Sequence, residues 1–175
     1  MKLSIFLLAT GLLVTNASGG SDGFDDIKCG SDIAKALVGK HMAKQKVVDL
    51  EKRHADIGLK DLGADEISDR LSTISWLICG SEFLVLADGP IVRDAVKVPA
   101  HSKKAPFFSG HCEFNGKESK DIVVAILDNE KETNAYPLPA KVAWKIDQKE
   151  KKFVPIPVEG LRCPQDGVSS EDSGL

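Results

Sequence analysis

Four cysteines are spaced widely along this chain of 175 residues, and they limit the folds open to it more than any other residues do. They are Cys29, Cys79, Cys112 and Cys163. An even number of cysteines in an exported chain predicts two disulfide bonds, and four cysteines allow three connectivities. The sequence alone does not choose among these. We favour Cys29–Cys79 with Cys112–Cys163, which would close two successive loops of about 50 residues and remove about 4 kcal/mol of unfolded-state entropy each.

The cysteine spacing also excludes two common kinds of site. No C-x-x-C pair occurs, so neither a thioredoxin-type redox motif nor a paired-cysteine zinc signature is present. Four buried free thiols remain the alternative to two disulfides. Export favours the disulfides, because an oxidising compartment does not leave thiols reduced.

The amino terminus has the three-part organisation of a secretory signal peptide. Lys2 precedes an uncharged, mainly apolar run over residues 3–14, and small polar residues follow. That run is too short to span a bilayer, which needs about 20 apolar residues in a helix. We predict cleavage after Ala17, with Gly19 as the second choice; the alternative is a buried amphipathic helix. A secreted or periplasmic protein without a membrane span is expected.

Composition indicates one domain with a mildly acidic surface. We divide the chain into a cleaved signal peptide (1–17, or 1–19), a flexible leader (18–27), a single globular domain (28–163) and a disordered acidic tail (164–175). The net charge of −3 becomes −4 without Lys2. Since there is no basic stripe, nucleic acid and anionic membranes are not expected as partners.

Apolar residues alternate along several segments as they do in β-strands. Residues 71–78, 83–87 and 92–98 are separated by short turns, which predicts an antiparallel meander. Asn115-Gly116 is a favoured hairpin dipeptide, and residues 122–127 are apolar throughout, as in a strand covered on both faces. Residues 142–146 should pair with 153–158, whose prolines require a sheet edge.

Helical signals are few. Ser31 is predicted to cap a short helix over residues 34–38 that ends at Gly39, and residues 47–50 are predicted to start a strand. Residues 55–70 have no clear pattern beyond one helical turn near 65–70. The expected fold class is therefore α+β, mainly antiparallel β: a single sheet or a small sandwich with one or two short helices.

No catalytic, cofactor-binding or metal-binding residues can be assigned, and no cofactor is expected. His101 and His111 flank a long loop and would converge only if its ends meet, while Cys112 and His111 are strand neighbours whose side chains diverge. Asp61, Asp65 and Asp69 recur every four residues, but they lack the ligand order of a calcium loop. We interpret them as a solvated acidic segment.

The loop over residues 99–110 is the place where a binding surface is expected first. Phe107 and Phe108 follow Pro106 in this loop and lie close in sequence to Lys103 and Lys104. An aromatic pair in such a loop either anchors the loop to the core or meets a partner. These four residues are the candidate partner contacts.

These observations favour a binding or inhibitor-type module that acts on a protein or a cell-envelope component, and they lean away from an enzyme. The first alternative is a small secreted hydrolase or lyase whose site forms only in the fold, from His101, His111 and the 61–69 segment. The second is a structural envelope protein. The sequence does not identify the partner.

Overall fold

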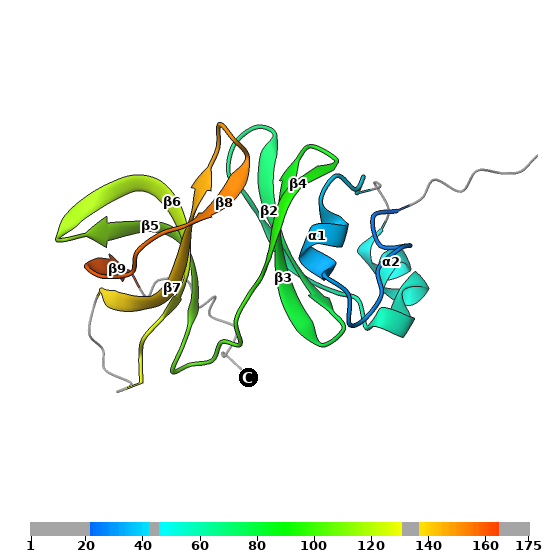
Figure 1. Cartoon of the computed structure of the whole chain (residues 1–175), viewed down its shortest axis with the longest axis horizontal. Helices are drawn as coiled ribbons and strands as arrows, with labels where there is room; N and C mark the ends of the chain where they lie inside the picture. Colours follow the sequence, from blue (N-terminus) through cyan, green and yellow to red (C-terminus); the bar gives the residue numbers. More distant parts are fainter. Residues whose placement is uncertain (1–21, 43–45, 131–136, 165–175) are drawn as a thin grey trace, which may run out of the picture.

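A computed structural model describes residues 22–42, 46–130 and 137–164 of the chain. The fold is mainly antiparallel β, with one open four-strand sheet, one small four-strand barrel and two short helices (Figure 1). The predicted fold class is confirmed, with the strands divided between two sheets. The predicted signal peptide and nearly all of the predicted tail lie outside the described residues.

The open sheet is an antiparallel meander with strand order β1-β2-β3-β4. Its strands are β1 (Lys60–Glu66), β2 (Leu71–Ile78), β3 (Ser81–Asp88) and β4 (Ile91–Lys97). The three predicted strands are β2 to β4. Cys79 and Gly80 join β2 to β3 with φ values of 52° and 72°, as a two-residue turn with left-handed central residues requires. β1 falls in the segment for which the sequence shows no clear pattern.

The barrel closes because β6 pairs with both β5 and β7, while β9 bridges β5 and β7. Its strands are β5 (Phe107–Phe114), β6 (Lys117–Leu127), β7 (Leu138–Asp147) and β9 (Leu161–Cys163). A further strand, β8 (Lys152–Pro155), pairs only with β7 and is an edge strand, as predicted from Pro155 and Pro157 in the segment 153–158. Asn115 and Gly116 form the predicted hairpin turn between β5 and β6.

Two helices and one 3₁₀ turn precede the sheets. They are α1 (Ile33–Leu37), α2 (Val47–Arg53) and η1 (Ala55–Ile57). Asp32, not Ser31, caps α1, because its carboxylate accepts a hydrogen bond from the Lys35 N–H. The prediction that residues 47–50 start a strand is wrong. They form the first turn of α2, which buries Leu50 and exposes Val47 and Val48.

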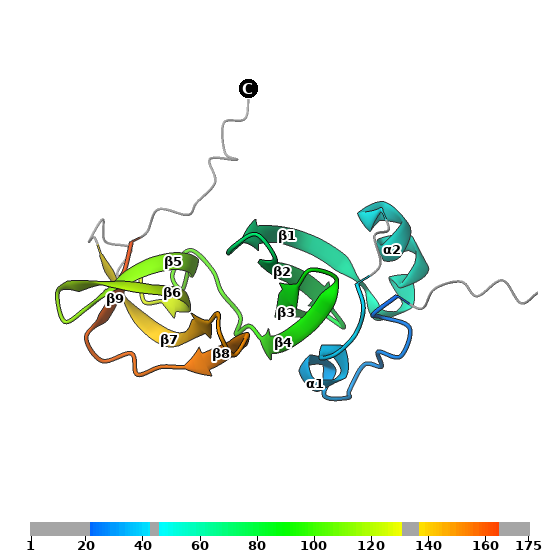
Figure 2. The same ribbon diagram turned by 90° about the horizontal axis from the view of Figure 1, so that it is seen from above.

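The molecule has three layers: the helices, the open sheet and the barrel (Figures 1 and 2). β3 lies in the middle and is buried on both faces. Phe83 and Val85 pack toward the helices, whereas Leu84 and Leu86 pack against the barrel strands. β6 alternates in the same way between the barrel interior and the open sheet, which explains its unbroken apolar run over 122–127.

Polar contacts join the open sheet to the barrel beside this shared core. Asp88 in β3 accepts a hydrogen bond from Lys151, which lies in the turn between β7 and β8. Asp94 in β4 accepts one from the Phe153 N–H at 2.8 Å. The two sheets therefore meet through both apolar packing and specific hydrogen bonds.

Residues 22–27, the described part of the stretch expected to be a flexible leader (18–27), pack against the rest of the protein. Asp22, Phe24 and Ile27 are buried, and the two apolar side chains belong to the core beneath the helices. Their burial explains why a glycine-rich, acidic stretch is ordered here. The amino-acid composition of this stretch did not predict its packing, because only two of its residues, Phe24 and Ile27, place apolar side chains in the core.

Two disulfides link Cys29 to Cys79 and Cys112 to Cys163, the connectivity that we favoured. The first ties the segment before α1 to the end of β2, and the second lies inside the barrel. Two disulfides in a small β domain suggest an extracellular disulfide-bonded module. Within the described residues, no helix is long and apolar enough to cross a membrane.

Candidate functional site

The two lysines of the predicted binding loop lie at the tip of a tight turn. Ser102 and Ala105 exchange two main-chain hydrogen bonds of 3.0 and 2.9 Å, so that residues 103 and 104 are the turn between them. Both lysines are exposed. We call residues 102–105 the lysine turn.

Asn129 forms two hydrogen bonds to the backbone of the lysine turn. Its main-chain N–H donates to the Lys104 carbonyl at 2.9 Å, and its side-chain Nδ2 donates to the Lys103 carbonyl at 3.3 Å. Asn129 is itself buried. The backbone of the lysine turn is therefore fixed at both residues that carry the charges.

Phe107 and Phe108 are the first two residues of β5, so the loop predicted over residues 99–110 ends before Phe107. Phe108 is 6% exposed and belongs to the barrel core. Phe107 is partly buried and packs against the core between the sheets. The structure thus places Phe108 as an anchor of the loop and leaves the two lysines, with the exposed part of Phe107, at the surface.

The histidines considered for catalysis have separate partners. His101 Nε2 lies 2.6 Å from Glu82 Oε2, and the His101 ring contacts Phe107 at a centroid distance of 5.8 Å. His111 Nδ1 lies 3.3 Å from the main-chain oxygen of Asp121 on the neighbouring strand. Neither interaction brings a third catalytic group to the imidazole.

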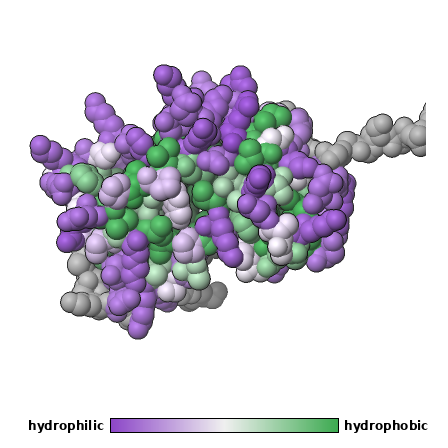
Figure 3. All heavy atoms as spheres, viewed as in Figure 1, coloured by the Kyte–Doolittle hydropathy of each residue, from purple (hydrophilic) through white to green (hydrophobic). Residues whose placement is uncertain are grey.

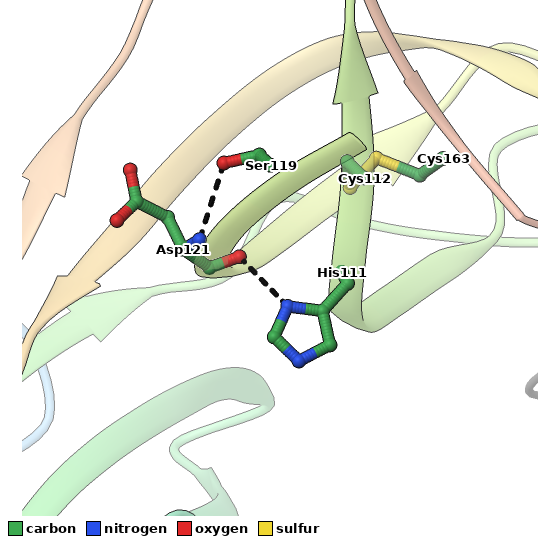
Figure 4. The surroundings of a disulfide bond; sticks show 5 residues. All are labelled: His111, Cys112, Ser119, Asp121 and Cys163. Carbon is green, nitrogen blue, oxygen red and sulfur yellow. Dashed lines mark hydrogen bonds between the residues drawn. A yellow bond between two sulfur atoms is a disulfide. The ribbon is translucent and has the colours of Figure 1, made fainter. Parts of the chain in front are cut away.

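His111 and Cys112 do not form a thiol–imidazole pair. Cys112 is bonded to Cys163, and Figure 4 shows the imidazole on the other side of β5 from this disulfide. The predicted divergence of neighbouring strand residues accounts for this arrangement.

The acidic segment is a strand and a turn, not a helix. Asp61 and Asp65 lie on β1, whereas Asp69 lies in the turn before β2. Asp61 Oδ1 accepts a hydrogen bond from the Gly63 N–H at 2.7 Å. β1 is an edge strand of the open sheet, whereas His101 pairs with Glu82 on β3, on the far side of β2. The residues that a hydrolase would need are therefore not brought together.

A buried ion-pair network at the amino-terminal end was missed by sequence reasoning. The Asp22 carboxylate lies 2.8 Å from His54 Nε2, accepts a hydrogen bond from Arg53 at 2.7 Å, and accepts another from the Phe24 N–H. Burial acts to raise the pKa of Asp22, but the hydrogen bond to His54 and the other contacts outweigh it and lower this pKa. Asp22 is thus ionised at neutral pH and ties the amino-terminal segment to α2.

The same network contains three groups close enough to hold a metal ion. Donor atoms of Asp22, Asp25 and His54 lie within 4.8 Å of one another. However, the Arg53 guanidinium contacts Asp22 directly, and a cation beside it is poorly suited to a metal ligand. We interpret the network as structural.

An apolar cavity of about 200 Å³ lies beside Asp22 and was also not predicted. Segments from five parts of the chain line it: residues 22–24, Met42, α2 and the strands β1 and β2. The apolar side chains among its lining residues are Phe24, Met42, Val47, Leu50, Ala64, Ile74 and Trp76. Because these residues are distant in sequence, only the tertiary fold reveals the cavity.

Among the described residues that line this cavity, Trp76 is the one with a buried side-chain polar atom that lacks a hydrogen-bond partner. Its side chain is 4% exposed and packs edge-on against Phe24, with ring centroids 5.0 Å apart. The indole Nε1 is buried and has no hydrogen-bond partner. A buried hydrogen-bond donor without an acceptor is uncommon and raises the free energy of the folded protein. A hydrogen-bond acceptor is therefore expected beside this atom.

Comparison of the chain with known protein families, with curated proteins and with solved structures gave no match. The function must therefore be argued from the geometry of the chain itself.

Proposed function

We propose that this chain is an extracellular, disulfide-bonded binding module that presents the lysine turn to an acidic surface of a partner protein. The observation that carries the proposal is the fixed backbone of residues 102–105, which is held by two main-chain hydrogen bonds and by Asn129. An inhibitor-type module would use the same turn.

Two physical arguments support a binding role for this turn. A turn that is ordered before binding loses less conformational entropy on association than a flexible loop does. The exposed ammonium group of Lys103 at its tip attracts carboxylates and steers the encounter with an acidic patch. Figure 3 shows hydrophilic residues around the rim of this face of the molecule and hydrophobic residues toward its middle.

The test compares retention of partners by the oxidised protein and by charge-reversal variants. The immobilised chain is exposed to the extracellular proteins of its own organism, and bound proteins are identified by mass spectrometry. We expect at least one acidic protein to bind the wild type and to be retained at least tenfold less by the double variant K103E/K104E. Its retention should also fall as salt is raised, because exposed charges are screened.

The matched control is the double variant K117E/K120E. It makes the same change of charge at two exposed lysines of β6, away from the lysine turn. The control should retain the partner as the wild type does. Equal retention by all three proteins, loss in both double variants, or retention of polysaccharide alone would overturn the proposal.

A second variant separates the position of the charges from their presence. Asn129→Ala keeps both lysines but removes the side-chain hydrogen bond to the Lys103 carbonyl. We expect weaker binding of the same partner with an unchanged salt dependence, because the charges remain and only the order of the turn is reduced. Unchanged affinity would show that the anchored backbone has no role.

A further inference from the structure

We propose that the cavity beside Trp76 is a second binding site, for a small uncharged apolar molecule with one hydrogen-bond acceptor. The Trp76 Nε1–H would donate to that acceptor. This site is independent of the lysine turn, because it is built from residues 22–24, Met42, α2, β1 and β2. Three properties of the cavity define the class of ligand.

The first property is size. An apolar cavity of roughly 150 Å³ accommodates benzene. The present cavity of about 200 Å³ is somewhat larger. It therefore fits an aromatic ring with a short substituent, or a branched chain of about nine non-hydrogen atoms.

The second property is charge. Asp22 and Asp61 are the only charged residues among the described residues that line the cavity, and both are acidic. The Asp22 carboxylate is already paired with Arg53 and His54, so a cationic group on the ligand is not needed to balance its charge. An anionic ligand would be repelled by Asp61, and a ligand charge of either sign would lose its hydration against a lining that is mostly apolar. A neutral ligand is favoured on both counts.

The third property is the unpaired indole donor. A ligand oxygen that accepts from Trp76 Nε1 removes the cost of a buried group without a partner. A purely apolar ligand of the same shape leaves that cost in place. The site should therefore prefer a ketone, ester or ether to the corresponding hydrocarbon.

Access to the indole donor requires a small side-chain movement, because Nε1 is itself buried. Met42 lines the same cavity, and methionine is unbranched and changes rotamer easily. Val47, also in the lining, is 39% exposed and places the cavity close to solvent. A ligand can thus enter without unfolding of the core.

The experiment uses two defined probes, acetophenone and its hydrocarbon analogue ethylbenzene. Each is titrated into the ¹⁵N-labelled oxidised protein while the two indole N–H resonances are followed by NMR. The resonance of Trp144 is assigned with the variant Trp144→Phe. We expect saturable binding of acetophenone with a downfield shift of the Trp76 indole proton, and no comparable shift with ethylbenzene.

Two variants test the roles of the donor and of the cavity. Trp76→Phe keeps an aromatic ring against Phe24 but removes the N–H. The ratio of the dissociation constants of acetophenone and ethylbenzene should rise roughly fivefold in this variant, since one hydrogen bond is lost. Ala64→Leu should weaken both probes by filling the cavity, whereas Asp65→Leu places the same side chain on the opposite face of β1 and should not.

An unchanged Trp76 resonance in the wild type at saturating acetophenone would overturn the proposal without any variant. So would undiminished binding to Ala64→Leu. The variant K103E/K104E should bind acetophenone as the wild type does, so the two proposed sites can fail separately.

Discussion

At the scale of single residues, Asp88 is, with Asp22, one of the two buried carboxylates in the described part of the chain. It is 3% exposed and contacts Arg93, Lys151 and Arg70. The hydrogen bond from Lys151 is the largest influence that lowers the pKa of Asp88; burial opposes it, and Arg93 and Arg70 add to the lowering. The carboxylate therefore stabilises the fold as an anion.

We predict that Asp88 makes the stability of the protein depend on pH in acid. In the unfolded chain this carboxylate titrates near its ordinary pKa of 3.8, whereas in the folded chain its pKa is lower. Its contribution is fully present above the unfolded pKa and is lost as the pH falls through the folded pKa. The difference in unfolding free energy between the wild type and Asp88→Asn should be constant above about pH 5 and shrink below pH 4.

Urea unfolding of both proteins at a series of pH values measures this difference. Other carboxylates titrate in both proteins and cancel in the comparison. A difference that stays the same between neutral pH and pH 2 would contradict the assignment of Asp88 as a stabilising anion.

Asp22 provides a second prediction at this scale. Asp22→Ala leaves His54 buried without its partner, so the unfolding free energy should fall by roughly 2–3 kcal/mol. Asp25→Ala removes an exposed carboxylate that lies 3.9 Å from the same imidazole and should cost less than about 0.5 kcal/mol. Thermal and urea unfolding report both values. Equal losses would mean that the amino-terminal segment is not held by Asp22.

At the scale of elements, alternation identified the strands that are buried on at least one face. The meander of β2 to β4, the hairpin of β5 and β6, and the pairing of β7 with β8 were all predicted. β1 was missed because nearly all of its residues are exposed, so it has no apolar alternation. β9 was missed because it is only three residues long.

In α2, the secondary-structure preference of the individual residues gave the wrong prediction. Val47 and Val48 have β-branched side chains, which favour strands, but the segment buries Leu50 and forms a helix through tertiary packing. The cavity and the Asp22 network were beyond prediction for a related reason. Their residues come from segments far apart in the chain, and no local pattern links them.

The cap of α1 can be tested directly. Asp32 accepts a hydrogen bond from the Lys35 N–H, whereas the Ser31 hydroxyl donates to the Lys28 carbonyl outside the helix. Asp32→Ala should reduce the unfolding free energy by about 1 kcal/mol, the usual value of an N-cap. Ser31→Ala should reduce it by clearly less. If urea unfolding showed a larger loss for Ser31→Ala than for Asp32→Ala, Ser31 would be the N-cap of α1.

At the scale of the whole molecule, each disulfide stabilises a different layer. Cys29–Cys79 fixes the segment before α1 to the open sheet, and Cys112–Cys163 links β5 to β9 inside the barrel. Neither disulfide joins the open sheet to the barrel. That connection depends on the shared apolar core, on the hydrogen bonds of Asp88 and Asp94, and on the chain between β4 and β5.

The shared core predicts that the two sheets unfold together. Leu86 and Val85 are neighbours on β3, and both are fully buried. Leu86 packs in the core between the sheets, whereas Val85 packs toward the helices. Leu86→Ala should cost about 2–5 kcal/mol through the cavity that it leaves, and it should weaken the barrel as well as the open sheet.

Native-state hydrogen exchange distinguishes coupled from separate unfolding. The amides of β6 belong to the barrel, so in Leu86→Ala their protection should fall together with that of β2 and β3. In Val85→Ala the segments around α1 and α2 should lose the most protection instead, because that side chain supports the helical layer. If Leu86→Ala left the β6 amides fully protected, the barrel would be an independent folding unit. The contacts of Asp88 and Asp94 would then join two domains instead of two halves of one.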